Sequence, residues 1–387
     1  MFRFDPYSPE IDADPFPAYK TLREEHPCFW SEDIEMWVLS RHKDIVMALN
    51  DWETFSSAKG NLVSELPGRQ GNTLGTTDPP RHDRLRALIQ KAVTKRALTH
   101  IIDPARATMR KHLDALKGRE QFDFVNELSS KYTVDLIVYL FDLPKENLQT
   151  VRDKAVLMVQ TDPETKQKGP EHIAAFEWMQ DYAAKLVEER KKNPGEDLLS
   201  QFILSEIDGE KLTDKEILLT VTTLIMAGIE SLSGFLTMLT KNITDFPEVR
   251  DALVADPSLV PDAVEESLRY NTSAQRFRRC INKEITLHGQ TMKKGDFVIL
   301  AYGSANRDEE VFPNADVYDL SRKPKGHLGF GGGVHACLGT AIARLACKVM
   351  LEELLTAYPN ISAVDQELRW MSSTNFRSPL ELQLKLG

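Results

Sequence analysis

The chain has 387 residues, and its 48 basic and 58 acidic side chains leave a formal net charge of −10. A chain of this length can bury a large core, and its acidic balance argues against a general nucleic-acid-binding protein. The four cysteines lie far apart without a Cys-x-x-Cys pair, which argues against a zinc site or a disulfide framework. We see no signal-peptide core and no run of about 18 apolar residues, so we expect a cytoplasmic protein without membrane association.

No linker, internal repeat or low-complexity tract divides the chain, so we expect residues 1–387 to form a single domain. Near the N-terminus, residues 14–26 predict a short helix. The aromatic and β-branched side chains at residues 29–30 and 36–39 then predict two strands. Residues 55–77 show no periodicity, and a loop of that length in a compact domain is usually functional.

The next helix is predicted to begin at the Asp-Pro-Pro sequence of residues 78–80, since proline is tolerated in a first helical turn. His82 and Arg86 are four residues apart and therefore share one face of this helix. Two cationic donors on one face suit a pair of carboxylates. Taken alone, the same pattern is also typical of a solvated basic helix start.

A capping box at residues 213–216 predicts a long helix that runs to about Asn242. Its first half is almost entirely apolar, so the helix should be buried. Gly228, Glu230 and Ser231 interrupt this apolar stretch, and a glycine and a carboxylate inside a buried helix are costly unless something uses them. The plain alternative is a glycine that permits close packing and a serine bonded back to its own turn.

The second half of the chain combines a charged helix pair with short strands. Glu266 and Arg269 are three residues apart on a predicted helix and therefore lie side by side, although such pairs are most often exposed and contribute little. Residues 284–287 and 297–300 predict strands. Residues 375–382 alternate in polarity, which predicts a hairpin.

Residues 330–339 read Phe-Gly-Gly-Gly-Val-His-Ala-Cys-Leu-Gly and precede a helix with apolar periodicity. The three glycines permit positive φ or close approach to a flat ligand. Cys337 stands just before the helix, where the macrodipole and the free N–H groups favour a thiolate. Alone, such a loop equally suits a phosphate cradle or a turn, and a lone cysteine is usually an inert buried residue.

The whole string resembles the haem-binding loop of the cytochrome P450 family, position for position, at Phe330, Gly331, Gly333, His335, Cys337 and Gly339. The Asp-Pro-Pro-x-His-x-x-x-Arg string at residues 78–86 and the pair Glu266 and Arg269 follow in the expected order. This resemblance implies a mainly α (α+β) single-domain fold, a triangular helical prism with small β regions. It places haem between the helix of Gly228 and the helix that follows Cys337.

The resemblance also implies how the haem, iron protoporphyrin IX (haem b), is held. Cys337 is implied as the axial ligand of the iron, whose chemistry favours O–O cleavage. The remaining cofactor-binding residues are implied to be His82, Arg86, Gly228, Arg279, Phe330, His335 and Gly339, of which His82, Arg86, Arg279 and His335 are assigned to the propionates. Arg276 and Arg278 are neighbours that are easily mistaken for Arg279.

By the same resemblance, Gly228 lets its helix pass over the haem where oxygen binds, and Glu230 and Ser231 are catalytic residues that relay protons for O–O cleavage. The family usually has threonine where this chain has Ser231. Serine keeps the hydroxyl but loses the methyl group that restricts the rotamer. We therefore expect retained activity with leakage of peroxide or tolerance of added peroxide. The pair Glu266 and Arg269 is implied to be structural and to lock onto Arg322.

The implied activity is a monooxygenase that inserts one oxygen atom from O2 into a small lipophilic substrate, aromatic or terpenoid, by hydroxylation or O-dealkylation. No flavin or iron–sulfur domain precedes Gly387, so NAD(P)H would act through a separate ferredoxin and ferredoxin reductase, or a flavodoxin. Lys91, Lys95 and Arg96 form a basic patch that either docks such a partner or is a solvated face. We expect a monomer. Two other classes stay open, a peroxide-using haem-thiolate peroxygenase and a non-catalytic haem- or lipophile-binding protein.

Overall fold

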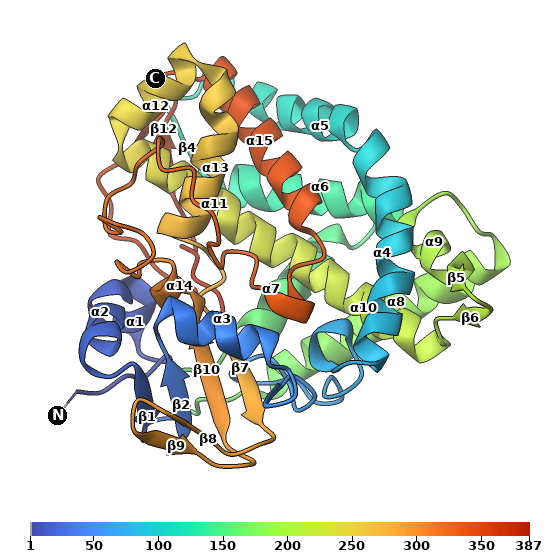
Figure 1. Cartoon of the computed structure of the whole chain (residues 1–387). Helices are drawn as coiled ribbons and strands as arrows, with labels where there is room; N and C mark the ends of the chain where they lie inside the picture. Colours follow the sequence, from blue (N-terminus) through green and yellow to red (C-terminus); the bar gives the residue numbers. More distant parts are fainter. Residues whose placement is uncertain (1) are drawn as a thin grey trace.

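Two parts of the chain that are distant in sequence, residues 28–56 and 276–301, form one sheet beside the N-terminus (Figure 1). The structure, a computed structural model, describes residues 2–387 apart from the side chains of residues 94–100. The five-stranded sheet has the order β1-β2-β10-β7-β3, with β2 and β10 parallel and the other neighbours antiparallel. Its strands are β1 (Cys28–Ser31), β2 (Met36–Leu39), β3 (Phe55–Ser56), β7 (Arg276–Ile281) and β10 (Phe297–Ala301). The strands predicted at residues 29–30, 36–39 and 297–300 are therefore confirmed.

Side-chain alternation along the central strands explains why helices cover both faces of this sheet. Val38 and Ile299 join the apolar cluster of the N-terminal segment and α2. Leu39 and Leu300, one residue further along each strand, join the cluster that contains α3. The helices of this region are α1 (Pro9–Ala13), α2 (Phe16–Glu25), α3 (His42–Asn50) and the short α14 (Tyr302–Ala305).

The rest of the chain is mostly helical and shares one large apolar core (Figure 1). Its α-helices are α4 (Arg81–His100), α5 (Ile102–Asp114), α6 (Ser130–Phe141), α7 (Leu148–Val159), α8 (Pro170–Lys192), α9 (Leu198–Leu204), α10 (Asp214–Met226), α11 (Leu232–Asp245), α12 (Pro247–Ala255), α13 (Val260–Tyr270) and α15 (Thr340–Ala357). Short 3₁₀ turns are η1 (Leu74–Thr76), η4 (Pro257–Leu259) and η5 (Gly333–His335), and η2 (Val125–Ser129) and η3 (Ala227–Ser231) are π-helical. The mainly α fold with small β regions is confirmed.

The long helix made of α10, η3 and α11 runs from Asp214 to Asp245 and begins at the predicted capping box. Thr213 Oγ1 accepts the Glu216 N–H at 3.3 Å, and Glu216 Oε2 accepts the Thr213 N–H at 2.9 Å. An 18-residue window of this helix reaches a mean hydropathy of 1.6, and 56% of the window is buried. Our reading that no such apolar run exists was therefore wrong. The helix is apolar because other helices of the protein surround it, α6, α7, α8 and α13 among them.

The remaining strands form small sheets, and the C-terminal hairpin is less regular than we predicted. The strands are β4 (Gln121–Asp123), β5 (Glu206–Ile207), β6 (Glu210–Lys211), β8 (Ile285–Leu287), β9 (Gln290–Met292), β11 (Ser362–Ala363) and β12 (Gln383–Lys385). Residues 375–382 pair back through an isolated bridge between Trp370 and Pro379, and the regular strand β12 begins only at Gln383. Proline has no N–H to continue a ladder, which limits the pairing here.

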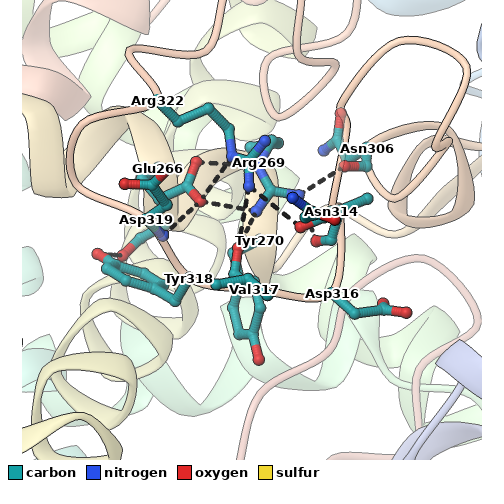
Figure 2. A network of polar contacts seen from close by, with 12 residues as sticks. Glu266, Arg269, Tyr270, Asn306, Asn314, Asp316, Val317, Tyr318, Asp319 and Arg322 are labelled. Atoms are coloured by element: carbon teal, nitrogen blue, oxygen red, sulfur yellow. Dashed lines mark hydrogen bonds and ion pairs between the residues drawn. The ribbon is translucent and has the colours of Figure 1, made fainter.

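Glu266 and Arg269 on α13 anchor the long segment that leads from β10 to Cys337 (Figure 2). Both side chains are completely buried, so the alternative of an exposed pair is wrong. Arg269 donates through Nε and Nη2 to the two carboxylate oxygens of Glu266 at 2.9 and 2.7 Å. Its other N–H groups donate to the carbonyls of Asn306, Ala315 and Val317 at 3.1, 2.8 and 3.1 Å. Arg322 Nε donates to Glu266 Oε1 at 3.2 Å, which confirms the predicted third member.

Candidate functional site

The backbone of the cysteine loop is held by hydrogen bonds at both ends. At its start, the Gly331 N–H donates to the Leu328 carbonyl at 2.9 Å. At its end, the Cys337 N–H donates to the Phe330 carbonyl at 2.9 Å, and Thr340 Oγ1 donates to the Cys337 carbonyl at 2.8 Å. The loop therefore places Cys337 three residues before α15, as the sequence predicted.

Gly333 allows this loop to lie directly against the end of α3. Its φ is +61°, and a Cβ atom at this position would lie 2.0 Å from the Leu49 carbonyl oxygen. A side chain here would therefore meet both a disfavoured backbone conformation and a backbone atom that cannot move aside. The three glycines thus serve the path of the loop, which brings the cysteine to its place.

All four cysteines are unpaired, and Cys337 differs from the others in being exposed; Cys28, Cys280 and Cys347 are buried. The density of protein around its sulfur raises the pKa of the Cys337 thiol. The Gly339 N–H, the Thr340 hydroxyl and the positive charges of Arg86 and Arg344 oppose that effect and lower the pKa. An accessible thiol with these donors and cations around it is suited to bind a metal as the thiolate.

Three of the four residues that we assigned to the propionates lie together beside the loop. The rings of His82 on α4 and His335 on η5 meet edge to face with centroids 4.5 Å apart. Arg279 on β7 is buried, and its positive charge contributes to lowering the pKa of His335. Burial is the main reason that this pKa falls to about 4, and Asp78, whose carboxylate lies 3.9 Å from His335 Nε2, opposes the fall. Arg86 instead donates to the Ala336 carbonyl at 2.9 Å, next to the cysteine.

The nitrogens of these histidines show what the cluster can hold. Among the described residues, no hydrogen-bond partner exists for His82 Nε2 or for either ring nitrogen of His335, although all three atoms are buried. Buried polar atoms without partners are costly and rare, so a ligand with acceptor oxygens is expected here. A haem, with two propionates and an iron that a thiolate can ligate, fits His82, His335, Arg279 and Cys337.

The strand β7 resolves which of three neighbouring arginines faces this cluster. Side chains alternate along a strand, so Arg276 and Arg278 share the face opposite Arg279. Arg278 donates to the carbonyls of Val63 and Lys59 at 3.0 and 3.1 Å. Arg276 donates through Nε to the Thr374 carbonyl at 2.8 Å. Both are therefore directed away from the histidines.

The second group of predicted residues lies in the π-helical segment η3 of the long helix. Such single π turns inside α-helices are frequent at functional sites. Ser231 Oγ donates to the Ala227 carbonyl at 2.5 Å, which is the local bond that the plain alternative foresaw. Burial raises the pKa of Glu230 to about 7, and the positive charge of Arg152 on α7 partly opposes the rise. Glu230 can therefore take up and release a proton near neutral pH.

Gly228 permits close contact between the long helix and α6. A Cβ atom at Gly228 would lie 2.4 Å from Ile137 Cδ1, which is too close for real atoms. This supports the packing interpretation of the glycine. Its predicted role beside the haem stays a prediction.

The predicted basic patch is only partly described. Lys91 Nζ donates to the Glu206 carbonyl at 2.9 Å and is thus engaged with the β5–β6 hairpin. The side chains of Lys95 and Arg96 lie outside the described residues, so the patch stays a prediction.

Sequence reasoning missed several residues that shape the site. Asp78 accepts from Ser56 Oγ at 2.5 Å and from the Ser57 N–H at 2.9 Å, so it ties the start of α4 to the loop after β3. Arg152 and the π turn gave no pattern that we recognised. Arg344 did leave a signal, because it follows Cys337 by seven residues and lies about one turn into the helix that begins at Thr340.

A model of the family described as Cytochrome P450 matches residues 120–369. The chain therefore belongs to the cytochrome P450 family, whose members use haem and O2 and generally draw electrons from partner proteins. It is a cytochrome P450 monooxygenase.

Among its relatives, Nocardicin C N-oxygenase from Nocardia uniformis subsp. tsuyamanensis is 33% identical, and the match covers 97% of each chain. Solved structures agree. CYP109E1 from Bacillus megaterium, in complex with testosterone, is 29% identical with a TM-score of 0.90 over 98% of this chain and 100% of that one. The cytochrome P450 PksS of the Bacillus subtilis bacillaene polyketide synthase is 27% identical with a TM-score of 0.91 over 99% and 100%.

Proposed function

We propose that this protein inserts one oxygen atom from O2 into a small lipophilic substrate, aromatic or terpenoid in class, by hydroxylation or O-dealkylation. The observation that carries this proposal is an exposed, unpaired Cys337 two residues after His335, where buried histidine nitrogens have no hydrogen-bond partner among the described residues. Such a set fits haem b, with Cys337 as the ligand of the iron. His82, Arg279 and His335 would hold the propionates, with Arg86 beside them, and Phe330 and Gly339 would frame the thiolate.

When bound, the haem supplies the reduction and cleavage of O2, and the residues of the chain manage protons and position. Glu230 holds a proton on its carboxyl up to about pH 7 and exchanges it there, so it is the proposed proton carrier. Ser231, one residue further along the π turn, donates its hydroxyl hydrogen to the Ala227 carbonyl, and its oxygen can accept a hydrogen bond. The Gly228 contact with Ile137 fixes the place of this turn against α6.

The electrons would come from NAD(P)H through a separate ferredoxin and ferredoxin reductase, or a flavodoxin. We further propose a single haem domain over residues 1–387, a monomer in the cytoplasm without binding to membranes or nucleic acids. Among the described residues, one helix is apolar enough to cross a membrane, and it contacts several other helices of the protein, which supports this reading.

The experiment is to purify the protein, record the spectrum of its reduced carbon-monoxide adduct, and titrate candidate substrates. A thiolate ligand predicts the red-shifted adduct of this family, and a colourless protein would overturn the proposal. The panel should hold aromatic acids, phenols, terpenoids and steroids, the last because a relative of the same fold binds testosterone. Turnover with ferredoxin, reductase and NADH then tests the monooxygenase.

One observation favours a second candidate, the peroxide-using peroxygenase. The Ser231 hydroxyl donates its hydrogen to the Ala227 carbonyl within its own turn, so in this conformation it has no hydrogen to donate towards O2. Turnover with peroxide but none with the electron-transfer proteins would establish that candidate. A protein that shows substrate-induced spectral shifts without any turnover would be a haem- or lipophile-binding protein instead.

A further inference from the structure

A second charged group, separate from the Glu266 network, lies on the α15 side of the cysteine loop. It consists of Glu265 on α13, His327 in the segment before the loop, and Arg344 on α15. Arg344 donates through Nε and Nη2 to the two oxygens of Glu265 at 2.5 and 2.8 Å. His327 Nε2 lies 3.0 Å from Glu265 Oε2. Glu265 thus joins two helices and the loop segment.

The hydrogen bonds of His327 define its charge. Its Nδ1 accepts the Gly329 N–H at 3.2 Å and therefore carries no proton. The ring is then neutral, its proton sits on Nε2, and it donates to Glu265. The group therefore holds one negative charge on Glu265 and one positive charge on Arg344, which sum to zero.

Phe330 connects this charged group to the cysteine, because Arg344 contacts its ring and Cys337 bonds to its carbonyl. The Arg344 guanidinium carbon lies 4.9 Å from the centre of the Phe330 ring, a cation–π contact, and the Phe330 carbonyl accepts the Cys337 N–H at 2.9 Å. The bidentate bond to Glu265 fixes the plane of the guanidinium over the ring. The charge of Arg344 is also felt at the sulfur, since it lowers the pKa of the Cys337 thiol.

We propose that Glu265 is a positioning residue for the thiolate: it holds Arg344 against Phe330 and cancels its charge, and so sets the electrostatic potential at the Cys337 sulfur. This inference rests on the proposed function, because it takes Cys337 as the ligand of the iron. Reduction adds negative charge at the iron, so a net positive charge nearby favours the reduced form and a net negative charge opposes it.

The test measures the reduction potential of the haem-bound protein in charge-changing variants. Glu265→Gln leaves Arg344 uncancelled, so the potential should shift to more positive values. Arg344→Gln leaves Glu265 uncancelled, so it should shift to more negative values. The double variant restores neutrality and should return towards wild type. A loss of folding stability alone is not expected to shift the reduction potential in opposite directions in the two single variants and to restore it in the double variant.

Two further variants separate position from charge. Arg344→Lys keeps the positive charge but loses the planar contact with Phe330, so the potential should stay near wild type while the carbon-monoxide adduct loses its thiolate band faster. Glu353→Gln is the matched control, because Glu353 accepts a bidentate bond from Arg110, at 2.7 and 3.1 Å, near the other end of α15. It should leave both the potential and the adduct unchanged.

The inference is overturned if Glu265→Gln and Arg344→Gln shift the potential in the same direction, or by no more than Glu353→Gln does. If Glu265→Gln yields no haem protein, Arg344→Gln and Arg344→Lys decide the same point, and equal potentials for those two overturn it. A wild-type protein without the thiolate adduct would defeat the proposed function itself. A normal wild-type adduct with unchanged variants would defeat this inference alone.

Discussion

Replacing Arg269 by lysine tests whether the buried network of α13 depends on guanidinium geometry rather than on charge. Arg269 is completely buried, and each of its five N–H groups has an acceptor (Figure 2). Lysine keeps the positive charge but offers three donors on a single nitrogen. Glu266 Oε1 and the Val317 carbonyl keep a bond from Arg322, at 3.2 and 3.3 Å. Glu266 Oε2 and the carbonyls of Asn306 and Ala315 are bonded by two different nitrogens of Arg269, and we expect the single nitrogen of lysine to leave at least one of these three without a donor.

The cost follows from the acceptor that loses its donor. A buried polar group left without its partner costs about 1–3 kcal/mol, so R269K should cost at least that much. The whole stability of a folded protein is about 5–15 kcal/mol. The three carbonyl acceptors belong to the segment that leads to the cysteine loop, so we expect R269K to lose stability and most of its bound haem together.

The assay measures two quantities. One is the free energy of unfolding in urea, monitored by circular dichroism, and the other is the yield of the thiolate carbon-monoxide adduct. Arg369→Lys is the control, because Arg369 pairs with Glu381 at 3.0 Å while 71% of its side chain is exposed. This change should cost less than about 0.5 kcal/mol. If R269K costs no more than the control, the argument from donor counting is refuted.

Three further predictions concern the π turn of the long helix. In Gly228→Ala, the overlap of the new methyl with the end of Ile137, about 1–3 kcal/mol, opposes the roughly 1 kcal/mol that alanine gains over glycine in a helix. Urea unfolding should therefore show a net cost of at most about 2 kcal/mol, and a smaller cost or a gain in an Ile137→Val background; an equal effect in both backgrounds would contradict the packing account. Glu230 loses its proton as the pH rises through about 7, so turnover of the wild-type protein should fall over that range. Glu230→Gln should lower kcat by about 10²-fold and remove this fall from the pH–rate profile. An unchanged profile would exclude Glu230 as the proton donor. Ser231→Ala should form less product per NADH consumed and release more peroxide, and coupling as good as wild type would remove its role.

The sequence predicted what short-range chemistry determines. The capping box at Thr213 and the strands around Trp37 were found in place. The distant partner Arg322 was also found in place, but it was implied by the family resemblance and not by local pattern. Whether a charged pair is exposed or buried was harder to predict, because residue spacing alone does not indicate burial. Glu266 and Arg269 have the spacing of a surface pair, yet both side chains are completely buried. The π turn at Ala227–Ser231 was missed for a related reason, since one extra residue in a helical turn leaves almost no trace in a periodic pattern.

The candidate site needed the structure because its decisive property is a lack of partners, which no sequence pattern shows. Arg269 is a buried cation with every donor satisfied, so it has nothing to offer a ligand. His82 and His335 are buried with nitrogens that no described residue satisfies. Unpartnered donors alone do not define a site, since Arg276 also has two buried nitrogens without partners. What singles out the histidines is their place: His335 lies two residues from an accessible thiol, while Arg276 lies on the opposite face of β7 from Arg279.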